Sequence, residues 1–322
     1  MITNIFRPFA ACLFSSKHKL LIGSAVKQLR DEIANTRSLC RESTHKNKVT
    51  AVNAFERFLI ETQQNAAVLS IDKVTPDHIK AFERWLLDQG YSPNYASLHM
   101  RCLRALLNRI NGKGSQLFSC VRTSNCQTLK RAVSTYTIKR LNCMKLPMGT
   151  SIALARDIFL FCFYCMGMPL IDAVMLKKSQ LINGCLSYRR QKTGRLVNIP
   201  ISHGLTLLIE RLSESSSSYL LPILTTDNRT EGYHQYKRFY QRYRRDLLKL
   251  GDMIEGNVHL TSYTARHTWA SIVYQHGGSI NAIAKALGHT NSNTTYSYIQ
   301  DISDNELATA NEIALKAIFS TL

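Results

Sequence analysis

Four side chains in the second half of the chain, Lys192, Arg266, His289 and Tyr298, are of types that could together cleave a phosphodiester. A phenol has an ordinary pKa of about 10, so it becomes a nucleophile only where a neighbour accepts its proton or a positive field favours the phenolate. Attack on a phosphodiester builds negative charge on the non-bridging oxygens, which an arginine can hold through two parallel hydrogen bonds. The leaving oxygen needs an acid, and a lysine at a hairpin tip can supply it.

The order and spacing of these residues make the pattern specific. Arg266 lies in "TARHTWAS", His289 follows a glycine, and Tyr298 comes nine residues later. Ser262 and Ser279 are placed to cap two successive helices, and a third helix is expected to carry Tyr298. A chain folded back twice in this way brings the three side chains toward one point. No cluster of carboxylates suggests a Mg²⁺ site, so we expect the protein itself to supply the cations, without a cofactor.

The charge of the chain indicates the class of partner. Its 322 residues include 41 Lys and Arg against 22 Asp and Glu, a formal net charge of +19. Such a surplus destabilises a compact chain unless a polyanion neutralises it, and nucleic acid and an anionic membrane surface are the two candidates. No apolar run approaches the roughly 20 residues that span a bilayer, which favours nucleic acid over a membrane. The nine cysteines are odd in number and scattered, which favours a reducing cytoplasm.

Periodicity and composition divide the chain into five segments. They are a leader at 1–42, a helical domain at 43–117, a basic linker at 118–149, a second domain at 150–302 and a tail helix at 303–322. The helical domain is expected to be a bundle of about four helices with a basic face. The linker could lie along phosphates, although a solvated connector has the same composition. The tail could dock on a neighbouring protomer or pack on its own domain.

The second domain is expected to be mostly helical around a small sheet. "GCLSYRRQKTGRLVNIPIS" alternates on both sides of a turn, which predicts a β-hairpin with Lys192 beside its turn. "YHQYKRFYQRYRRDLLKLG" predicts a basic helix. The basic side chains expected to bind DNA are Arg101, Arg104, Lys130, Arg131, Lys237, Arg238, Arg242 and Arg245.

Three motifs resemble those of a known family. "LTSYTARHTWAS", "ALGHTNSNTTYSYI" and "YRRQKTGRLVNIPI" resemble the box motifs of the tyrosine recombinases, the phage integrase family, and the resemblance extends over roughly residues 43–300. It implies a mainly α fold with a small β-sheet, in which a helical, SAM-like DNA-clamp domain precedes a catalytic domain. By this likeness Tyr298 is the nucleophile that forms a 3′-phosphotyrosine link, with Arg266 and His289 in its pocket and Lys192 as the general acid.

Two positions depart from the family pattern. Tyr263 stands where the family usually has histidine, as in a similar branch of mobile-element integrases and DNA invertases, and it can donate a hydrogen bond to phosphate. Pro169 stands where the family places its first arginine. Arg156 is the nearest arginine upstream, and it either supplies the missing charge or pairs with Asp157.

We therefore expect a bacterial, cytoplasmic and nucleoid-associated enzyme that integrates, excises or inverts a DNA segment. Its substrate is expected to be duplex DNA with inverted-repeat core sites, bound by a homo-oligomer, a tetramer on paired sites. Two alternatives stay open. One is a DNA-binding protein that kept the fold and lost catalysis, and the other is a DNA-relaxing enzyme of the type IB topoisomerase kind.

Overall fold

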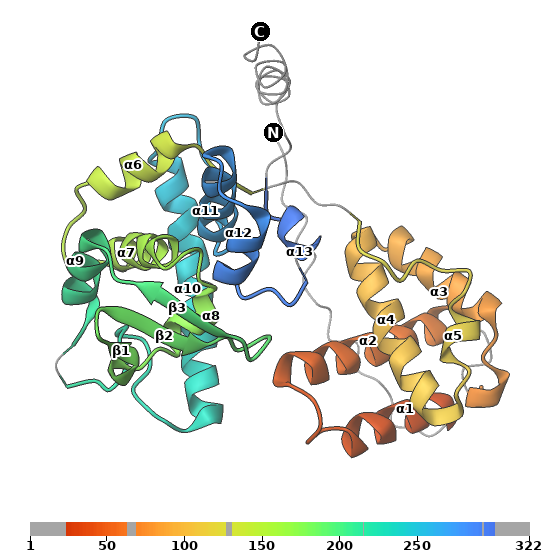
Figure 1. Cartoon of the computed structure of the whole chain (residues 1–322). Coiled ribbons are helices and arrows are strands. Elements are labelled where there is room, and N and C mark those ends of the chain that lie inside the picture. The colour runs from red at the N-terminus through yellow and green to blue at the C-terminus, as the bar shows by residue number, and fades with distance from the viewer. Residues whose placement is uncertain (1–23, 63–68, 127–130, 215, 292, 300–322) are drawn as a thin grey trace, which may run out of the picture. The chain divides into compact units, whose positions relative to one another are not determined.

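The computed structural model describes residues 24–62, 69–126, 131–214, 216–291 and 293–299 (Figure 1). The chain divides into two compact units, residues 1–127 and residues 128–322. The tail predicted at 303–322 and Lys130 lie outside the described residues. No helix within the described residues is long and apolar enough to cross a membrane.

The first unit is a helical bundle built on apolar stripes. Its helices are α1 (Ser24–Asn35), α2 (Glu42–Glu61), α3 (Pro76–Asp88), α4 (Pro93–Asn111) and the short α5 (Gly114–Leu117), with a 3₁₀ turn at Ile71–Lys73. The side chains of Phe55, Phe58 and Phe82 meet in the buried centre, with ring centroids 5.2 to 6.1 Å apart. As predicted, α3 begins at a Thr75 cap followed by Pro76.

The boundaries of the segments differ from the sequence-based prediction at two places. Helix α1 was assigned to the leader, but Val26 and Leu29 are buried in the core of the first unit. The basic linker contains helix α6 (Thr135–Cys143), whose Leu141 is fully buried in the core of the second unit. Both segments are polar in overall composition, but each has apolar residues at helical spacing. These residues pack against a neighbouring helix, and the segment folds as a helix for that reason.

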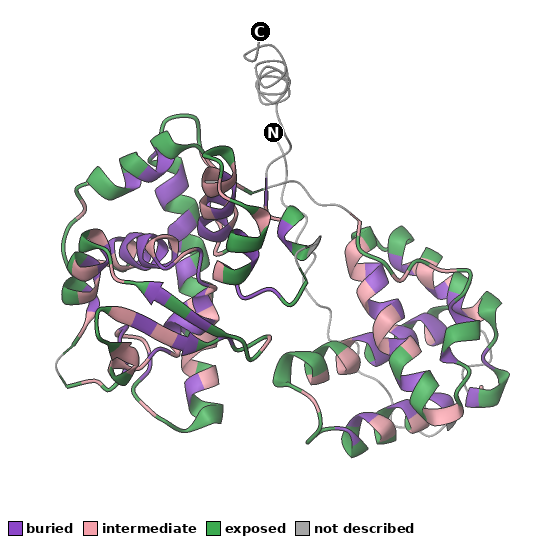
Figure 2. Ribbon diagram, viewed as in Figure 1, coloured by how far each residue is buried: buried purple, intermediate pink, exposed green. Residues whose placement is uncertain are grey.

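The second unit packs one face of a small sheet against helices (Figure 2). Besides α6, its elements in chain order are α7 (Ser151–Tyr164), α8 (Leu170–Val174), a 3₁₀ turn at Lys178–Gln180, β1 (Leu181–Ile182), β2 (Cys185–Arg189), β3 (Leu196–Pro200), α9 (His203–Leu212), α10 (Arg229–Asp252), α11 (Thr264–Gln275), α12 (Ile280–Ala286) and α13 (Asn293–Tyr296). Helix α7 lies at the centre, and its residues from Ala155 to Cys162 are all buried.

The predicted hairpin is confirmed as β2 and β3, which pair antiparallel with Leu186 opposite Ile199 and Tyr188 opposite Val197. These four side chains face the core, and β1 adds a short edge by pairing with β2 in the order β1-β2-β3. Because side chains alternate along a strand, Arg190 falls on the same buried side as Leu186 and Tyr188.

The three closing helices follow the predicted order with two corrections. Ser279 caps α12 through its hydroxyl, as predicted, but α11 begins after Tyr263 rather than at a Ser262 cap. Helix α13 ends at Tyr296, so Tyr298 lies just beyond its helix instead of within it. The end of α13 leaves the Tyr298 backbone available to the side chains of α11.

The turn between α7 and α8 approaches α11 closely at Gly167. Its φ is +69°, and a Cβ atom added there would lie 2.8 Å from the Cα atom of Arg266. Only glycine fits this turn without displacing α11, because both the backbone conformation and the space exclude a side chain.

We predict that Gly167→Ala destabilises the protein by at least about 2 kcal/mol more than Gly149→Ala, measured by urea unfolding. Gly149 is a matched control, since its φ of +76° is similar but a Cβ atom there would meet nothing within 4 Å. Equal losses in the two variants would contradict the close approach at Gly167.

Candidate active site

Arg266, on the first turn of α11, is the centre of a group of polar side chains. Its side chain is buried, with 2% of the residue exposed. Nη1 donates to the Gly167 carbonyl at 2.9 Å, and Nη2 donates to the Leu287 carbonyl at 2.7 Å and lies 3.0 Å from Nε2 of His289. Burial and the charge of Arg190 lower the pKa of Arg266. The described residues place no carboxylate within ion-pair distance of this guanidinium.

His289 follows α12 and is held in one protonation state by its neighbours. Nε2 faces an N–H donor of Arg266, so it must accept, and the ring proton is left on Nδ1. Nδ1 can then donate to Oγ1 of Thr295 at 2.9 Å. Burial, followed by the charges of Arg266, Arg190 and Lys192, lowers the pKa of His289 to about 3. The imidazole is therefore a neutral acceptor at neutral pH.

Tyr298 is docked beside both of these residues in the same chain. Its ring centroid lies 5.0 Å from Cζ of Arg266 and 5.1 Å from the ring centroid of His289. The backbone carbonyl of Tyr298 accepts a hydrogen bond from Oγ of Ser271 at 3.3 Å. The same carbonyl lies 3.3 Å from Nδ1 of His267. The structure thus brings together Arg266, His289 and Tyr298, as the spacing of the sequence predicted.

His267, the neighbour of Arg266 on α11, contacts Tyr298. Its ring centroid lies 4.8 Å from that of Tyr298, with 34° between the two ring planes. Together with Ser271 it fixes the segment that follows α13. The sequence signal for this contact was the spacing of 267 and 271, which share one face of a helix.

Tyr263 lines a small cavity next to Arg266. The cavity has a volume of about 60 Å³, and Pro169, Tyr236, Tyr240 and Tyr263 are among its lining residues. Partial burial, with a contribution from Tyr298, raises the pKa of Tyr263, so its phenol is neutral and can donate a hydrogen bond. Pro169 contributes no charge to this cavity.

Lys192 belongs to the turn of the β2–β3 hairpin and is exposed. The turn is attached to the end of α12, because Nη1 of Arg190 and Oγ1 of Thr193 each donate to the Gly288 carbonyl at 3.1 Å. Oδ1 of Asp172 accepts from the backbone N–H of Gln191 at 2.8 Å. Lys192 is thereby held beside His289, whose pKa its charge helps to lower.

Arg190 and Asp172 were missed by the sequence-based prediction. Arg190 is buried, with 6% of the residue exposed, and its Nε lies 3.9 Å from Oδ2 of Asp172. Burial raises the pKa of the Asp172 carboxyl, while the Gln191 N–H and the two arginines lower it. The alternation of the hairpin was the available signal, since it puts position 190 on the buried face.

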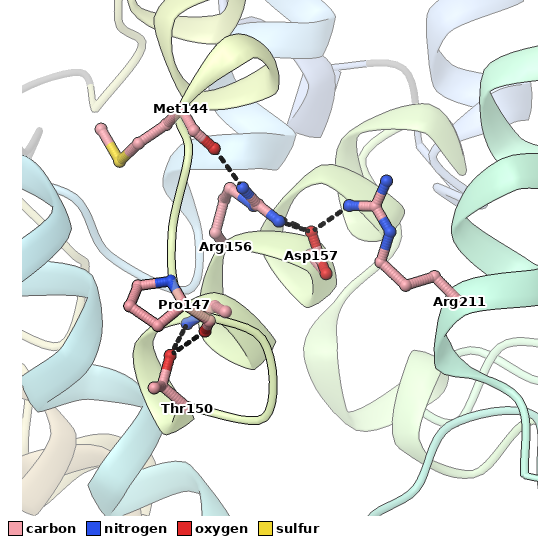
Figure 3. Close-up of polar contacts among 7 residues, drawn as sticks. Met144, Pro147, Thr150, Arg156, Asp157 and Arg211 are labelled. Carbon is pink, nitrogen blue, oxygen red and sulfur yellow. Dashed lines mark hydrogen bonds and ion pairs between the residues drawn. The ribbon is translucent and has the colours of Figure 1, made fainter.

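Arg156 is not part of this group, and its candidacy for the missing charge is corrected (Figure 3). Its Nε donates to Oδ1 of Asp157 at 2.8 Å, and its Nη1 donates to the Met144 carbonyl. Arg211 also reaches Asp157 at 3.1 Å. Arg156 precedes the end of α7 by eight residues, about 12 Å along the helix axis. Pairing with Asp157, the alternative left open by the sequence, accounts for this side chain.

The basic residues expected to bind DNA fall into two groups. On α10, Arg242 and Arg245 are exposed, Lys237 lies over the Tyr233 ring, and Arg238 forms an ion pair with Glu231 at 3.2 Å. Arg131 is also exposed.

On α4, by contrast, the two arginines bind the chain's own backbone and side chains. Arg101 donates to the Thr123 carbonyl at 3.0 Å and to Oδ1 of Asn125 at 2.8 Å, and Arg104 donates to Oγ1 of Thr123 at 3.2 Å. These bonds hold the segment that leaves the first unit.

Comparisons with known proteins identify the family of this fold and site. Residues 139–304 match the phage integrase family, and residues 24–109 match the phage integrase SAM-like domain. The chain belongs to the phage integrase family. It is a tyrosine-type site-specific recombinase, and the family match starting at residue 24 includes α1 in the SAM-like domain.

Similar sequences carry the same enzyme type in their names. Tyrosine recombinase XerC of Rickettsia felis is 23% identical over 295 residues, covering 86% of this chain and 93% of the relative. Tyrosine recombinase XerC of Rickettsia africae is 26% identical over 250 residues, covering 73% and 79%.

Solved structures share the fold at lower identity. The Tn1549 transposon integrase, solved with transposon right end DNA, has a TM-score of 0.61 at 13% identity and covers 89% of this chain and 98% of its own. A lambda integrase dimer bound to a COC′ core site has a TM-score of 0.60 at 15% identity, with 85% and 77% covered.

We predict that His289 stays neutral between about pH 5 and pH 8, with its proton on Nδ1. The unfolded chain, with a pKa of about 6.5 for this group, binds the extra proton first, so His289 lowers stability as the pH falls below that value. Nitrogen–proton NMR of the histidine rings, with His289→Gln for assignment, measures this. A His289 titration midpoint above about pH 5 would contradict the buried, neutral imidazole.

Proposed function

We propose that Tyr298 is the nucleophile of this recombinase and attacks a DNA phosphorus within the pocket formed by Arg266 and His289. The observation that carries the proposal is the contact among these three side chains in one chain, with Cζ of Arg266 5.0 Å from the Tyr298 ring. That contact also supports cleavage by the tyrosine of the same subunit whose arginine binds the phosphate.

The proposed step exchanges one phosphodiester for another. The Tyr298 oxygen forms a bond to phosphorus, and the bond from phosphorus to the 5′ oxygen breaks, which leaves a 3′-phosphotyrosine and a 5′-hydroxyl end. The phenol proton passes to solvent, because the positive charge of Arg266 beside the ring favours the phenolate. Arg266 holds the charge on the non-bridging oxygens, and the Tyr263 phenol donates a further hydrogen bond to phosphate. Reversal of the step by another 5′-hydroxyl rejoins DNA without an external energy source.

Lys192 is proposed as the acid that protonates the leaving 5′ oxygen. It is exposed at the hairpin turn, and the bonds of its neighbours Arg190 and Thr193 to the Gly288 carbonyl keep the turn beside His289. An ammonium at this place can reach the side of the phosphate opposite the attacking phenol, which in-line displacement requires.

Duplex DNA is proposed as the partner, and a homo-oligomer of this chain is proposed to bind it. The net charge of +19 and the exposed Arg242 and Arg245 on α10 support phosphate binding. Relatives of the same fold have been solved on DNA, among them a lambda integrase tetramer bound to a Holliday junction, with a TM-score of 0.61. Inverted-repeat core sites and a tetramer on paired sites follow for this chain as the finer part of the proposal.

Loss of catalysis is the alternative that Pro169 and Tyr263 would favour. The pocket argues against it, since Arg266 is buried without a carboxylate partner among the described residues and binds a neutral histidine. A protein that only binds DNA has no use for such a buried charge, which costs free energy to maintain.

The test is capture of a covalent adduct. Because the target sequence is unknown, a library of nicked duplexes with a randomised core is incubated with the protein, and DNA that stays attached in detergent is sequenced. We expect wild type to capture an inverted-repeat core, and Tyr298→Phe to form no adduct, since it lacks the attacking oxygen.

Tyr296→Phe is the matched control and is expected to keep wild-type adduct formation, because Tyr296 is exposed and outside the pocket. An adduct that persists in Tyr298→Phe and disappears in Tyr296→Phe would reassign the nucleophile. Capture of all sequences alike, with relaxation of any supercoiled plasmid, would instead indicate a topoisomerase.

A further inference from the structure

Arg190 carries a buried charge that has no role in the chemical step proposed above. Only its Nη1 makes a hydrogen bond within the described residues, to the Gly288 carbonyl at 3.1 Å. Its Nε is buried without a hydrogen-bond partner and lies 3.9 Å from the Asp172 carboxylate. A buried guanidinium with an unmatched N–H is costly unless a ligand completes its hydrogen bonds.

The charge of Arg190 acts in the same pocket as Arg266. It lowers the pKa of the Arg266 guanidinium, and it also lowers that of His289. Asp172 is the carboxylate that interacts with both arginines, so two positive charges face one negative charge. His289 is neutral and adds nothing to this sum. The pocket therefore has a surplus of positive charge that an anion from outside would neutralise.

The backbone around His289 brings the two guanidiniums together. Arg266 binds the His289 ring and the Leu287 carbonyl, and Arg190 binds the carbonyl of Gly288 between them. Gly288 has a φ of +63°, and a Cβ atom there would lie 3.0 Å from Cδ of Arg190. The absence of a side chain at 288 is what lets Arg190 run along this segment.

We propose that Arg190 is a second catalytic cation, which binds a non-bridging oxygen of the scissile phosphate alongside Arg266. The inference rests on the proposed function. As Tyr298 attacks, the charge on the phosphoryl group rises from −1 to −2, and two guanidiniums match it where one does not. Pro169 puts no charge on the α7–α8 turn beside Arg266, and Arg190 of the hairpin is the buried arginine whose charge acts on Arg266 and His289.

A purely structural part for Arg190 is the competing explanation, because it ties the hairpin and Lys192 to Gly288. The two explanations differ in how cleavage depends on the charge of the substrate. A cation that stabilises the phosphoryl charge becomes dispensable when a methyl group replaces a non-bridging oxygen. A residue that only holds the hairpin is needed equally for both substrates.

The experiment compares single-turnover cleavage of two nicked duplexes with the captured core sequence, one with a phosphodiester and one with a methylphosphonate at the scissile position. We expect Arg190→Ala to slow cleavage of the phosphodiester about 100- to 1,000-fold. On the methylphosphonate, the same variant is expected within about 10-fold of wild type. Equal slowing on both substrates, or wild-type cleavage of the phosphodiester, would overturn the proposal.

Arg190→Gln guards against a folding defect, since it keeps an uncharged N–H donor at the buried position of Nε. It is expected to melt at the wild-type temperature and to show the same loss and rescue. Arg189→Ala is the matched control. Arg189 is the exposed neighbour, and its side chain donates to the Gly194 carbonyl at 3.2 Å, so the cleavage rates of this variant should equal those of wild type. If wild type itself forms no adduct with the phosphodiester, the proposed function fails instead.

Discussion

The structure of the pocket depends on a buried guanidinium that is held by dipoles rather than by a carboxylate. Arg266 donates to the carbonyls of Gly167 and Leu287 and to the neutral ring of His289. Dipoles fix the position of the charge but leave it unneutralised, so the charge remains available to an anion that enters from solvent. An ion pair with a carboxylate would have fixed Arg266 equally well, but it would have neutralised the charge that an entering anion needs.

This constraint explains where the fold tolerates no side chain. Gly167 brings the α7–α8 turn against the backbone of Arg266, and Gly288 allows Arg190 to lie beside the segment that contains His289. Both carbonyls at these glycines accept from arginines of the pocket. The α7–α8 turn, the β2–β3 hairpin turn and the helices α11 and α12 are distant in sequence, and they meet at these two glycines. Each contributes polar groups to the pocket. Tyr298 is held beside the pocket by its contacts with His267 and Ser271 of α11.

Much of the arrangement could be predicted from local patterns. Strand alternation predicted the β2–β3 hairpin, and the Ser279 cap and the spacing around His289 predicted the return of the chain toward Arg266. The elements whose bounds were predicted wrongly depend on tertiary contacts. Helix α6 lies in a basic stretch, where the burial of Leu141 in the core of the second unit could not be predicted from composition. The C-terminal limit of α13 depends on the side chains of α11, which hold the Tyr298 carbonyl.

The arginines also show that distance along the chain does not predict which side chains meet in the pocket. Arg156 was the nearest candidate along the chain for a second cation, but its guanidinium binds Asp157 and the Met144 carbonyl, away from Arg266. Arg190 is close in space because the hairpin turn is attached to Gly288. Distance along one helix was thus a poor guide, whereas the two-residue period of the strand already put position 190 on the inner face.

The most direct measurement is a structure of the protein on nicked core DNA with vanadate in place of the scissile phosphate. Vanadate adopts the five-coordinate geometry of the transition state, so its ligands identify the groups that act there. The account predicts the Tyr298 oxygen at one axial position, and nitrogens of Arg266 and Arg190 about 3 Å from the equatorial oxygens. A vanadate bound with another residue at the axial position, or with Arg266 turned away from it, would contradict the account.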